Sequence, residues 1–342
     1  METNAPSAKE NVRSAWMRRI KRTLWIVGIA AAAVIVAVLI STATNALFEQ
    51  TERAQPSYGE RVDAGDGALN VVRHGTTGPT IVMLSGYGTA APGLDFAPLI
   101  RALDGYQVVV VEGFGYGHSD TTAPPRTIEN ITAELHTTLS KIGVEQPYVL
   151  MGHSLAGLYT LYYANEYRSE VSAVVGIDAS VPGQINGLAG GRSMLERFAW
   201  STGLLRVVTT IAPALAEPDG DAFAPDEREQ MRLMVNWNYT NPALVDEAAQ
   251  AAKNFAIVDR MTYPSDLPVL SFITKEDSQP RWGELHELQL QNLDHGKLIR
   301  LDGGHYLHWT RSTEIAGAVT AFLTAGATAA DITPESSAAR QE

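Results

Sequence analysis

The stretch PYVLMGHSLAG, residues 147–157, decides the fold. Its first five residues form an apolar run typical of a buried strand, and helical spacing of apolar residues follows from Leu155 to Tyr167. Between the two, Ser154 occupies a tight strand-to-helix turn, with the small residues Gly152 and Ala156 two positions before and after it. A serine hydroxyl exposed at such a turn, near a base and near amide donors, can attack a carbonyl carbon. Ser154 is therefore the candidate nucleophile, and the alternative is an ordinary helix N-cap serine.

Apolar runs and helical patterns alternate on both sides of this stretch. The runs that predict strands are Thr80–Leu84, Gln107–Val111, Pro147–Met151, Val171–Ile177, Val269–Thr274 and Lys297–Leu301. Helical spacing is found in Ile128–Lys141, Leu155–Tyr167 and Ile315–Leu323. Such alternation predicts an α/β fold with a mostly parallel, doubly wound sheet. Residues 182–265 contain helix-like pieces, Glu227–Asn236 and Pro242–Phe255 among them, but no convincing strand, and we interpret them as an inserted helical cap.

An apolar segment near the N-terminus predicts a membrane anchor. No charged residue occurs from Thr23 to Phe48, and Leu24–Ile40 is almost wholly apolar. About 20 such residues, at about 1.5 Å each, cross a bilayer core. Basic residues outnumber acidic ones before this segment, and the positive-inside bias therefore predicts a cytoplasmic N-terminus with the remainder outside. The alternative is a cleaved signal peptide, although an apolar part of 17 residues exceeds the usual length of about 7 to 15.

These observations divide the 342-residue chain into five parts. We predict a basic cytoplasmic segment (1–22), a transmembrane helix (23–48), an α/β core (58–181 and 266–325), the helical cap (182–265) and a disordered tail (326–342). The chain has no cysteine, which excludes disulfides and thiolate chemistry. Its net charge is -12 although its N-terminus is basic, so the folded part is acidic and nucleic acid is not expected as a partner. The expected location is the plasma membrane, crossed once.

The second chemistry-bearing stretch is LDGGHYLHW, residues 301–309, after the last predicted strand. Two glycines precede His305, and they would let a loop side chain reach the serine. The rival, His308, is expected to begin the next helix. We therefore prefer His305 as the general base.

Together these motifs resemble the α/β-hydrolase family across roughly residues 58–325. That family places a serine, an acid and a histidine in this order along the chain. The resemblance implies that Ser154 is the nucleophile and that an acid orients His305. The stretch PVLSFITKED resembles the family's seventh strand and following turn, which favours Asp277; the alternative acid is Asp178 in VVGIDASVP, after the preceding strand.

An oxyanion hole is expected from two backbone amides. One is the N–H of Leu155, directly after the nucleophile, and the resemblance assigns the other to Tyr87 in the stretch SGYG, where the family usually carries His-Gly. A glycine-rich turn, GFGYGHSD, also resembles a family turn. It lacks the G-x-G-x-x-G spacing with a helix directly after it, so no dinucleotide cofactor is expected. No metal site is expected either, because H-E-x-x-H is absent and the histidines are scattered.

The resemblance implies hydrolysis of a carboxylic ester through an acyl-enzyme, without a cofactor. A serine at the turn argues against dehalogenase and epoxide-hydrolase relatives, which use a carboxylate there. The predicted cap carries aromatic residues that favour an apolar small-molecule ester, or that serve as the cap's own core: Phe198, Trp200, Trp237, Tyr239 and Phe255, with Tyr263 beside it. The alternatives are an exported peptidase or acyltransferase with the same residues, or a non-catalytic ligand-binding protein. The sequence sets no oligomeric state.

Overall fold

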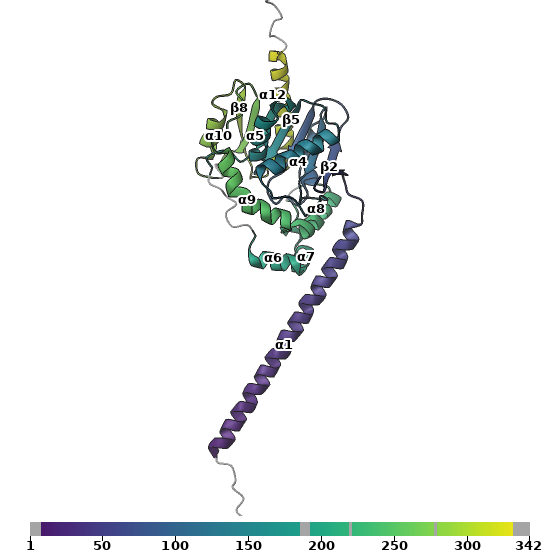
Figure 1. Ribbon diagram of the computed structural model, residues 1–342, viewed down its shortest axis with the longest axis vertical. Coiled ribbons are helices and arrows are strands. Elements are labelled where there is room, and N and C mark those ends of the chain that lie inside the picture. Colours follow the sequence, from purple (N-terminus) through teal and green to yellow (C-terminus); the bar gives the residue numbers. More distant parts are fainter. Residues whose placement is uncertain (1–7, 185–191, 219–220, 277–278, 331–342) are drawn as a thin grey trace, which may run out of the picture.

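A folded domain stands at one end of a long helix in the computed structural model, which describes residues 8–184, 192–218, 221–276 and 279–330 (Figure 1). The long helix, α1, runs over Ala8–Arg53 and extends beyond the predicted span of 23–48 at both ends. It is long enough and apolar enough to cross a membrane, and no residue of its apolar window is buried. The last part of α1 contacts the domain on the side where α6, α7 and α8 lie (Figure 1).

The domain is built on a sheet in which the described residues form eight strands, in the order β1-β2-β4-β3-β5-β6-β7-β8. Their bounds are β1 Glu60–Asp63, β2 Ala68–His74, β3 Thr80–Leu84, β4 Gln107–Glu112, β5 Tyr148–His153, β6 Val171–Ile177, β7 Val269–Thr274 and β8 Gly296–Leu301. The β1–β2 and β2–β4 pairings are antiparallel, and all the other pairings are parallel. The mostly parallel sheet is thus confirmed. Both ends of each of the six predicted strands fall within two residues of the ends of an observed strand.

Helices cover both faces of the sheet, which confirms the doubly wound arrangement. On one face α4 (Ile128–Lys141) and α5 (Ala156–Glu166) bury apolar side chains against the strands. On the other face lie α3 (Ala97–Ala102) and α12 (Ser312–Ala330). Short elements complete the domain: α2 Pro92–Asp95, η1 Arg168–Glu170, α10 Trp282–Leu290 and α11 Leu307–Thr310.

Further helices lie between β6 and β7, where the sequence predicted a helical cap. They are α6 Met194–Ser201, α7 Leu204–Ile211, η2 Pro213–Leu215, α8 Pro225–Asn238 and α9 Pro242–Val258, and we call them the insertion. The two predicted helix-like pieces fall within α8 and α9. A capping box starts α6, since the Ser193 side chain accepts from the Glu196 N–H and the Glu196 side chain accepts from the Ser193 N–H. The insertion has a small apolar core that includes Met234 and Trp237.

The C-terminal boundary differs from the sequence prediction. The expected disordered tail starts at residue 326, whereas α12 continues as a helix to Ala330. Alanine dominates this last turn and is the best helix former, which explains the continuation. The rest of the predicted tail, 331–342, lies outside the described residues.

Candidate active site

Two neighbouring strand ends bring candidate side chains together. Ser154 directly follows β5, Asp178 directly follows β6, and these strands pair in parallel with His153 opposite Ile177. Ser154 and Asp178 therefore lie side by side at the carboxyl edge of the sheet, where α/β proteins bind ligands. Both residues have a left-handed backbone, with φ of 53° for Ser154 and 42° for Asp178. Non-glycine residues rarely adopt this conformation, and those that do cluster at functional sites.

The turn around Ser154 is held by its backbone and by a close approach at its end. The N–H of Ser154 donates to the Ile177 carbonyl at 3.2 Å, and the N–H of Ser180 donates to the Ser154 carbonyl at 2.7 Å. A Cβ added to Gly157 would lie 2.3 Å from the Ser180 carbonyl oxygen, so this position requires glycine. Ala156, by contrast, is fully buried with its methyl group in place. The fold therefore accommodates an alanine at position 156, whereas position 157 requires a glycine.

A chain of hydrogen bonds runs from the serine through a histidine to a buried carboxylate. Nε2 of His305 lies 2.9 Å from Oγ of Ser154, and its Nδ1 lies 2.6 Å from Oδ2 of Asp178. The other carboxylate oxygen of Asp178 accepts a hydrogen bond from Nε1 of Trp282 at 2.8 Å. The Asp178 side chain is fully buried, whereas 42% of the His305 side chain is exposed. The Asp178 end of this series of hydrogen bonds is thus buried, and the His305 end reaches solvent.

The acid paired with His305 is the second of the two candidates that the sequence offered. Asp178 occupies the Nδ1 side of the imidazole, and a nitrogen with one hydrogen has room for one strong acceptor. The first candidate, Asp277, lies outside the described residues. Of the two candidates, the structure describes Asp178, which stands directly at the end of β6 and faces Nδ1 of His305.

Two buried histidines, His153 and His308, lie next to the hydrogen-bonded residues Ser154, His305 and Asp178. Nε2 of His153 faces the backbone carbonyl oxygen of His305 at 3.1 Å, and burial lowers the pKa of His153 well below its ordinary value. A neutral His153 can therefore donate to that carbonyl and hold the loop that carries His305. The rival base, His308, is fully buried, and its Nε2 lies 2.7 Å from Oδ2 of Asp95. His305, and not His308, is the histidine that faces Ser154.

Comparison with known proteins agrees with this architecture. The sequence profile described as alpha/beta hydrolase fold matches residues 79–202. YbdG, an uncharacterized protein of Bacillus subtilis (strain 168), is 26% identical over 265 residues, which make up 74% of this chain and 81% of YbdG. RutD of Escherichia coli O81 (strain ED1a), named as a carbamate hydrolase, is 34% identical over 102 residues, which make up 29% of this chain and only 37% of RutD.

Solved structures resemble the whole domain. A protein named as a lipase from Acinetobacter baumannii AYE superimposes with a TM-score of 0.59 at 18% identity, covering 84% of this chain and 97% of that one. A mutant epoxide hydrolase of Solanum tuberosum gives a TM-score of 0.62 at 15% identity, covering 79% of this chain and 100% of that one. The chain therefore has the α/β-hydrolase fold, and its residues 79–202 match the profile of that family.

The hydrogen bonds that join Ser154, His305 and Asp178 lie at a cavity of about 310 Å³. The cavity is lined by Tyr87, Ser154, Leu155, Asp178, Ser180, Gln184, Phe255, Gln279, Trp282 and His305. Both residues expected to supply oxyanion amides, Tyr87 and Leu155, are among them. A Cβ added to Gly86 would lie 2.7 Å from Cβ of Ser154, so a glycine here lets the loop with Tyr87 approach the nucleophile.

Most of the aromatic residues singled out in the sequence lie elsewhere. Phe255 is the member of that set that lines the cavity. Trp237 packs in the core of the insertion, and Tyr263 is buried with its hydroxyl 3.2 Å from Oγ1 of Thr160. Nε1 of Trp200 donates to a backbone carbonyl in α8. Of the aromatic residues that the sequence suggested for binding an apolar substrate, Phe255 therefore lines this cavity.

One group in the described part of the chain brings metal-ligating atoms close together. Oxygen and nitrogen atoms of Asp95, His153 and His308 lie within 4.8 Å of one another, and all three residues are buried. Nε2 of His308 faces the Asp95 carboxylate, and Nε2 of His153 faces the His305 carbonyl. Hydrogen bonds account for both Nε2 atoms, whereas Nδ1 of His153 and Nδ1 of His308 are buried without a hydrogen-bond partner.

Proposed function

We propose that this protein is a membrane-anchored serine hydrolase that cleaves carboxylic esters through an acyl-enzyme. The observation that carries the proposal is the hydrogen-bonded chain from Ser154 through His305 to Asp178, opening into a cavity. Nucleophile, base and acid in this connectivity are the minimum needed to activate a serine hydroxyl. A ligand-binding protein without activity would have no need of a left-handed serine facing an exposed imidazole.

The proposed reaction follows from the positions of the atoms. As Oγ of Ser154 bonds to the carbonyl carbon, its proton passes to Nε2 of His305, and the buried carboxylate of Asp178 stabilises the imidazolium. The developing oxyanion accepts from the N–H groups of Tyr87 and Leu155. The ester C–O bond then breaks, and the alcohol leaves with the proton held by His305. Water repeats the sequence on the acyl-enzyme and releases the acid.

The residue at the turn and the size of the cavity support the substrate class. A serine at position 154 forms an acyl-enzyme, whereas the epoxide hydrolases of the same fold use a carboxylate there. A cavity of about 310 Å³ lies at the lower end of the range for small-molecule sites. Its walls include the apolar or aromatic side chains of Leu155, Phe255 and Trp282. A small ester with an apolar group is therefore the substrate that we propose.

Membrane anchoring by α1 is supported by the continuity of that helix. Its uncharged run from Thr23 to Phe48 is long enough to span a bilayer, and the helix continues without a break to Arg53. Residues beyond the apolar run bind the insertion, Glu52 among them. The alternative, a signal peptide, would be cleaved after small residues such as those at 41–43. Cleavage there would cut α1 in a region whose following turns contact the folded domain. In the proposed topology the N-terminus is cytoplasmic and the hydrolase domain lies outside.

The test of the activity is labelling of the full-length protein in membranes with a fluorophosphonate. We expect the wild type and Ser265→Ala, which alters an exposed serine remote from the cavity, to be labelled, and Ser154→Ala not to be. A folded wild type that reacts no faster than Ser154→Ala would refute the hydrolase assignment.

Anchoring is tested separately by alkaline carbonate extraction and by protease treatment of intact cells. An anchored protein stays in the membrane pellet, and external protease removes its domain. Release into the carbonate supernatant would refute the anchor without affecting the activity assignment.

A further inference from the structure

Helices α6 and α7, with η2, present an unusual apolar surface. Among the described residues outside α1, eleven large apolar side chains are exposed, and eight of them lie between residues 194 and 215. We call these eight the apolar face: Met194, Leu195, Phe198, Leu204, Val207, Val208, Ile211 and Leu215. Met194 and Ile211 are 89% and 80% exposed. A soluble protein rarely leaves so many contiguous apolar side chains in water, so this face is expected to have a partner.

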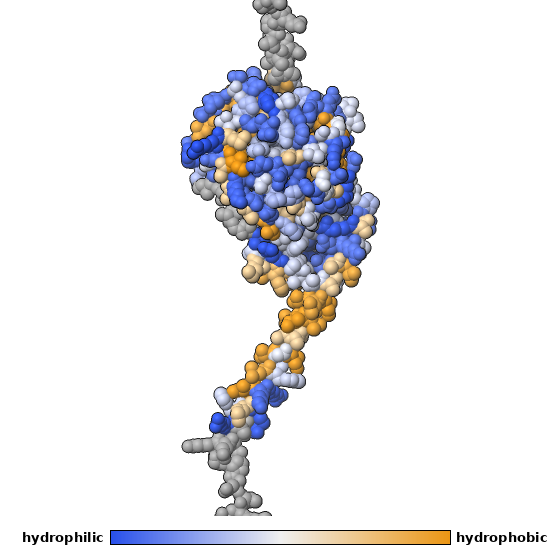
Figure 2. Space-filling view, in the orientation of Figure 1, coloured by the Kyte–Doolittle hydropathy of each residue, from blue (hydrophilic) through white to orange (hydrophobic). Residues whose placement is uncertain are grey.

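The apolar face lies directly beside the end of the apolar run of α1. Oγ of Ser41 donates to the Thr202 carbonyl at 2.7 Å, in the turn between α6 and α7. The next residue of that turn, Gly203, has a φ of 76°, and a Cβ added to it would lie 2.7 Å from Cβ of Asn45. The turn thus packs its bare backbone against α1. Figure 2 shows the hydrophobic stretch of α1 beginning where the helix leaves this end of the domain.

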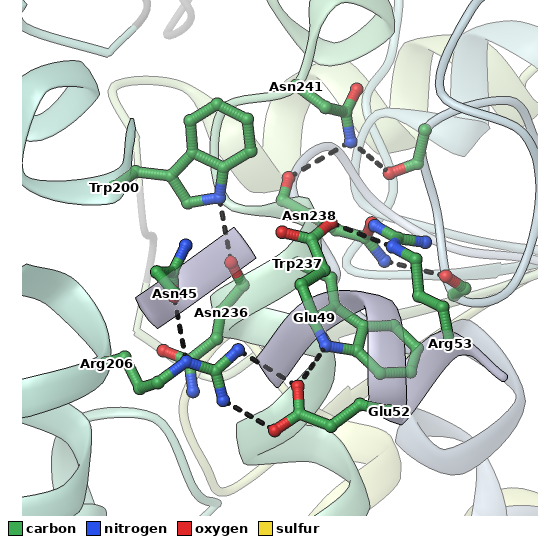
Figure 3. Close-up of polar contacts among 12 residues, drawn as sticks. Asn45, Glu49, Glu52, Arg53, Trp200, Arg206, Asn236, Trp237, Asn238 and Asn241 are labelled. Carbon is green, nitrogen blue, oxygen red and sulfur yellow. Dashed lines mark hydrogen bonds and ion pairs between the residues drawn. The ribbon is translucent and has the colours of Figure 1, made fainter. Parts of the chain in front are cut away.

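Polar contacts one to three turns further along α1 join that helix to the insertion (Figure 3). Arg206 of α7 donates two hydrogen bonds to the Glu52 carboxylate, at 2.7 and 2.9 Å, and a third to Oδ1 of Asn45 at 2.8 Å. Nε1 of Trp237 donates to the same carboxylate at 2.8 Å, and the Arg53 guanidinium lies 4.7 Å from the centre of the Trp237 ring. These polar groups all lie on the domain side of the Ser41 contact.

The position of these contacts along α1 sets their depth in a bilayer. A hydrocarbon core of about 30 Å takes about 20 helical residues. Counted from the basic cluster that ends at Arg22, it reaches approximately residue 42. The contact between Ser41 and Thr202 then falls at the outer hydrocarbon boundary. The ion pair of Arg206 with Glu52 lies about 15 Å further along the helix, on the water side of the hydrocarbon core. Helices α6 and α7 lie at the end of the domain nearest the apolar part of α1 (Figure 1).

We infer that the apolar face docks on the outer surface of the same bilayer that α1 spans. The inference rests on the proposed anchoring of α1. Continuity decides the occupant, because lipid surrounds α1 at the level where the turn between α6 and α7 touches it. Short amphipathic helices with apolar side chains on one face bury that face at the boundary between headgroups and acyl chains. The hydrolase domain is then held to the membrane at two places, by α1 and by the face next to it.

The absence of cysteine from the chain makes a single-site probe possible. The full-length protein is reconstituted in phosphatidylcholine vesicles with an environment-sensitive fluorophore on Val208→Cys, and separately on Leu288→Cys. These residues are matched apolar positions, 46% and 43% exposed, on α7 and on α10 respectively. We expect the probe at 208 to shift its emission to the blue and to be quenched by doxyl-labelled lipid, and the probe at 288 to show neither effect.

Two other outcomes would overturn the inference. A blue shift at 208 without quenching by doxyl lipid means that protein, such as a second copy of this chain, covers the face. A probe at 208 that behaves like the one at 288, in protein that resists carbonate extraction, means that α1 spans the membrane while the face stays in water. Release of the protein by carbonate would instead show that the anchor itself has failed, and fluorophosphonate labelling reports on the activity in every case.

Discussion

Replacing Asp178 with asparagine tests the assignment of the acid most directly, because the structure dictates how the new side chain is oriented. Nε1 of Trp282 can only donate, and it points at Oδ1 of residue 178 at 2.8 Å. In Asp178→Asn the amide oxygen must therefore face Trp282, and the NH2 group faces Nδ1 of His305. That nitrogen then has to accept, which places the imidazole proton on Nε2, facing Ser154. A protonated Nε2 cannot take the proton of the serine.

The wrong tautomer is expected to lower kcat by about 10⁴-fold, equivalent to about 5 kcal/mol of lost transition-state stabilisation. The assay is the hydrolysis rate of a short-chain p-nitrophenyl ester by each variant, with circular dichroism melting curves to establish that the variant is folded. Asp277→Asn is the control, and it should keep a rate near that of the wild type. A rate for Asp178→Asn within tenfold of the wild type, together with a thousandfold loss in Asp277→Asn, would refute the assignment and restore the first sequence candidate.

The remaining predictions concern the supports of the site. Trp282→Phe removes one hydrogen bond to a buried carboxylate, so the free energy of unfolding in urea should fall by about 1.5–3 kcal/mol, with a smaller loss of kcat than in Asp178→Asn. Gly157→Ala should destabilise by about 1–3 kcal/mol through the clash with Ser180, whereas Ala156→Gly should cost about 1 kcal/mol or less; equal losses would contradict the close approach. Burial raises the pKa of Glu247, so its charged form is disfavoured in the folded state. The wild type should lose stability relative to Glu247→Gln as pH rises above the ordinary glutamate pKa, and urea unfolding of both proteins at pH 5 and pH 8 measures the difference.

Buried parallel strands could be predicted from the sequence because each is a short apolar run. The first two strands are different. β1 buries one of its four residues, so it shows no apolar pattern. β2 carries Asn70, which is fully buried and donates to the buried carboxylate of Glu112 at 2.8 Å. A polar side chain satisfied by a distant partner interrupts the apolar run, and the sequence alone does not reveal that partner.

The contact between Ser154 and His305 could be anticipated because local sequence fixes the turns that carry them, but their other partners could not. Asp178 and Asp277 each follow an apolar run, and only the pairing of β5 with β6 shows which strand end stands beside Ser154. Trp282, 104 positions from Asp178, carries no motif that would announce its hydrogen bond. His153 is in the quoted elbow, yet its contact with the His305 carbonyl depends on a loop more than 150 residues away.

The contacts of the insertion differ in strength on its two sides. Toward the core, the buried amides of Asn238 and Asn241 donate to backbone carbonyl groups of the turn after β4, and the buried Glu247 accepts from two tyrosine hydroxyls at 2.6 Å each. Toward α1, the contact depends on Arg206 and Glu52, whose side chains are 15% and 21% exposed. Buried hydrogen bonds are costly to leave unmade, whereas a partly exposed ion pair can be replaced by water. The insertion should therefore move with the core as one body, and the joint to α1 should yield first. In the proposed orientation on the membrane, the domain can tilt about this joint without disturbing the chain from Ser154 to Asp178.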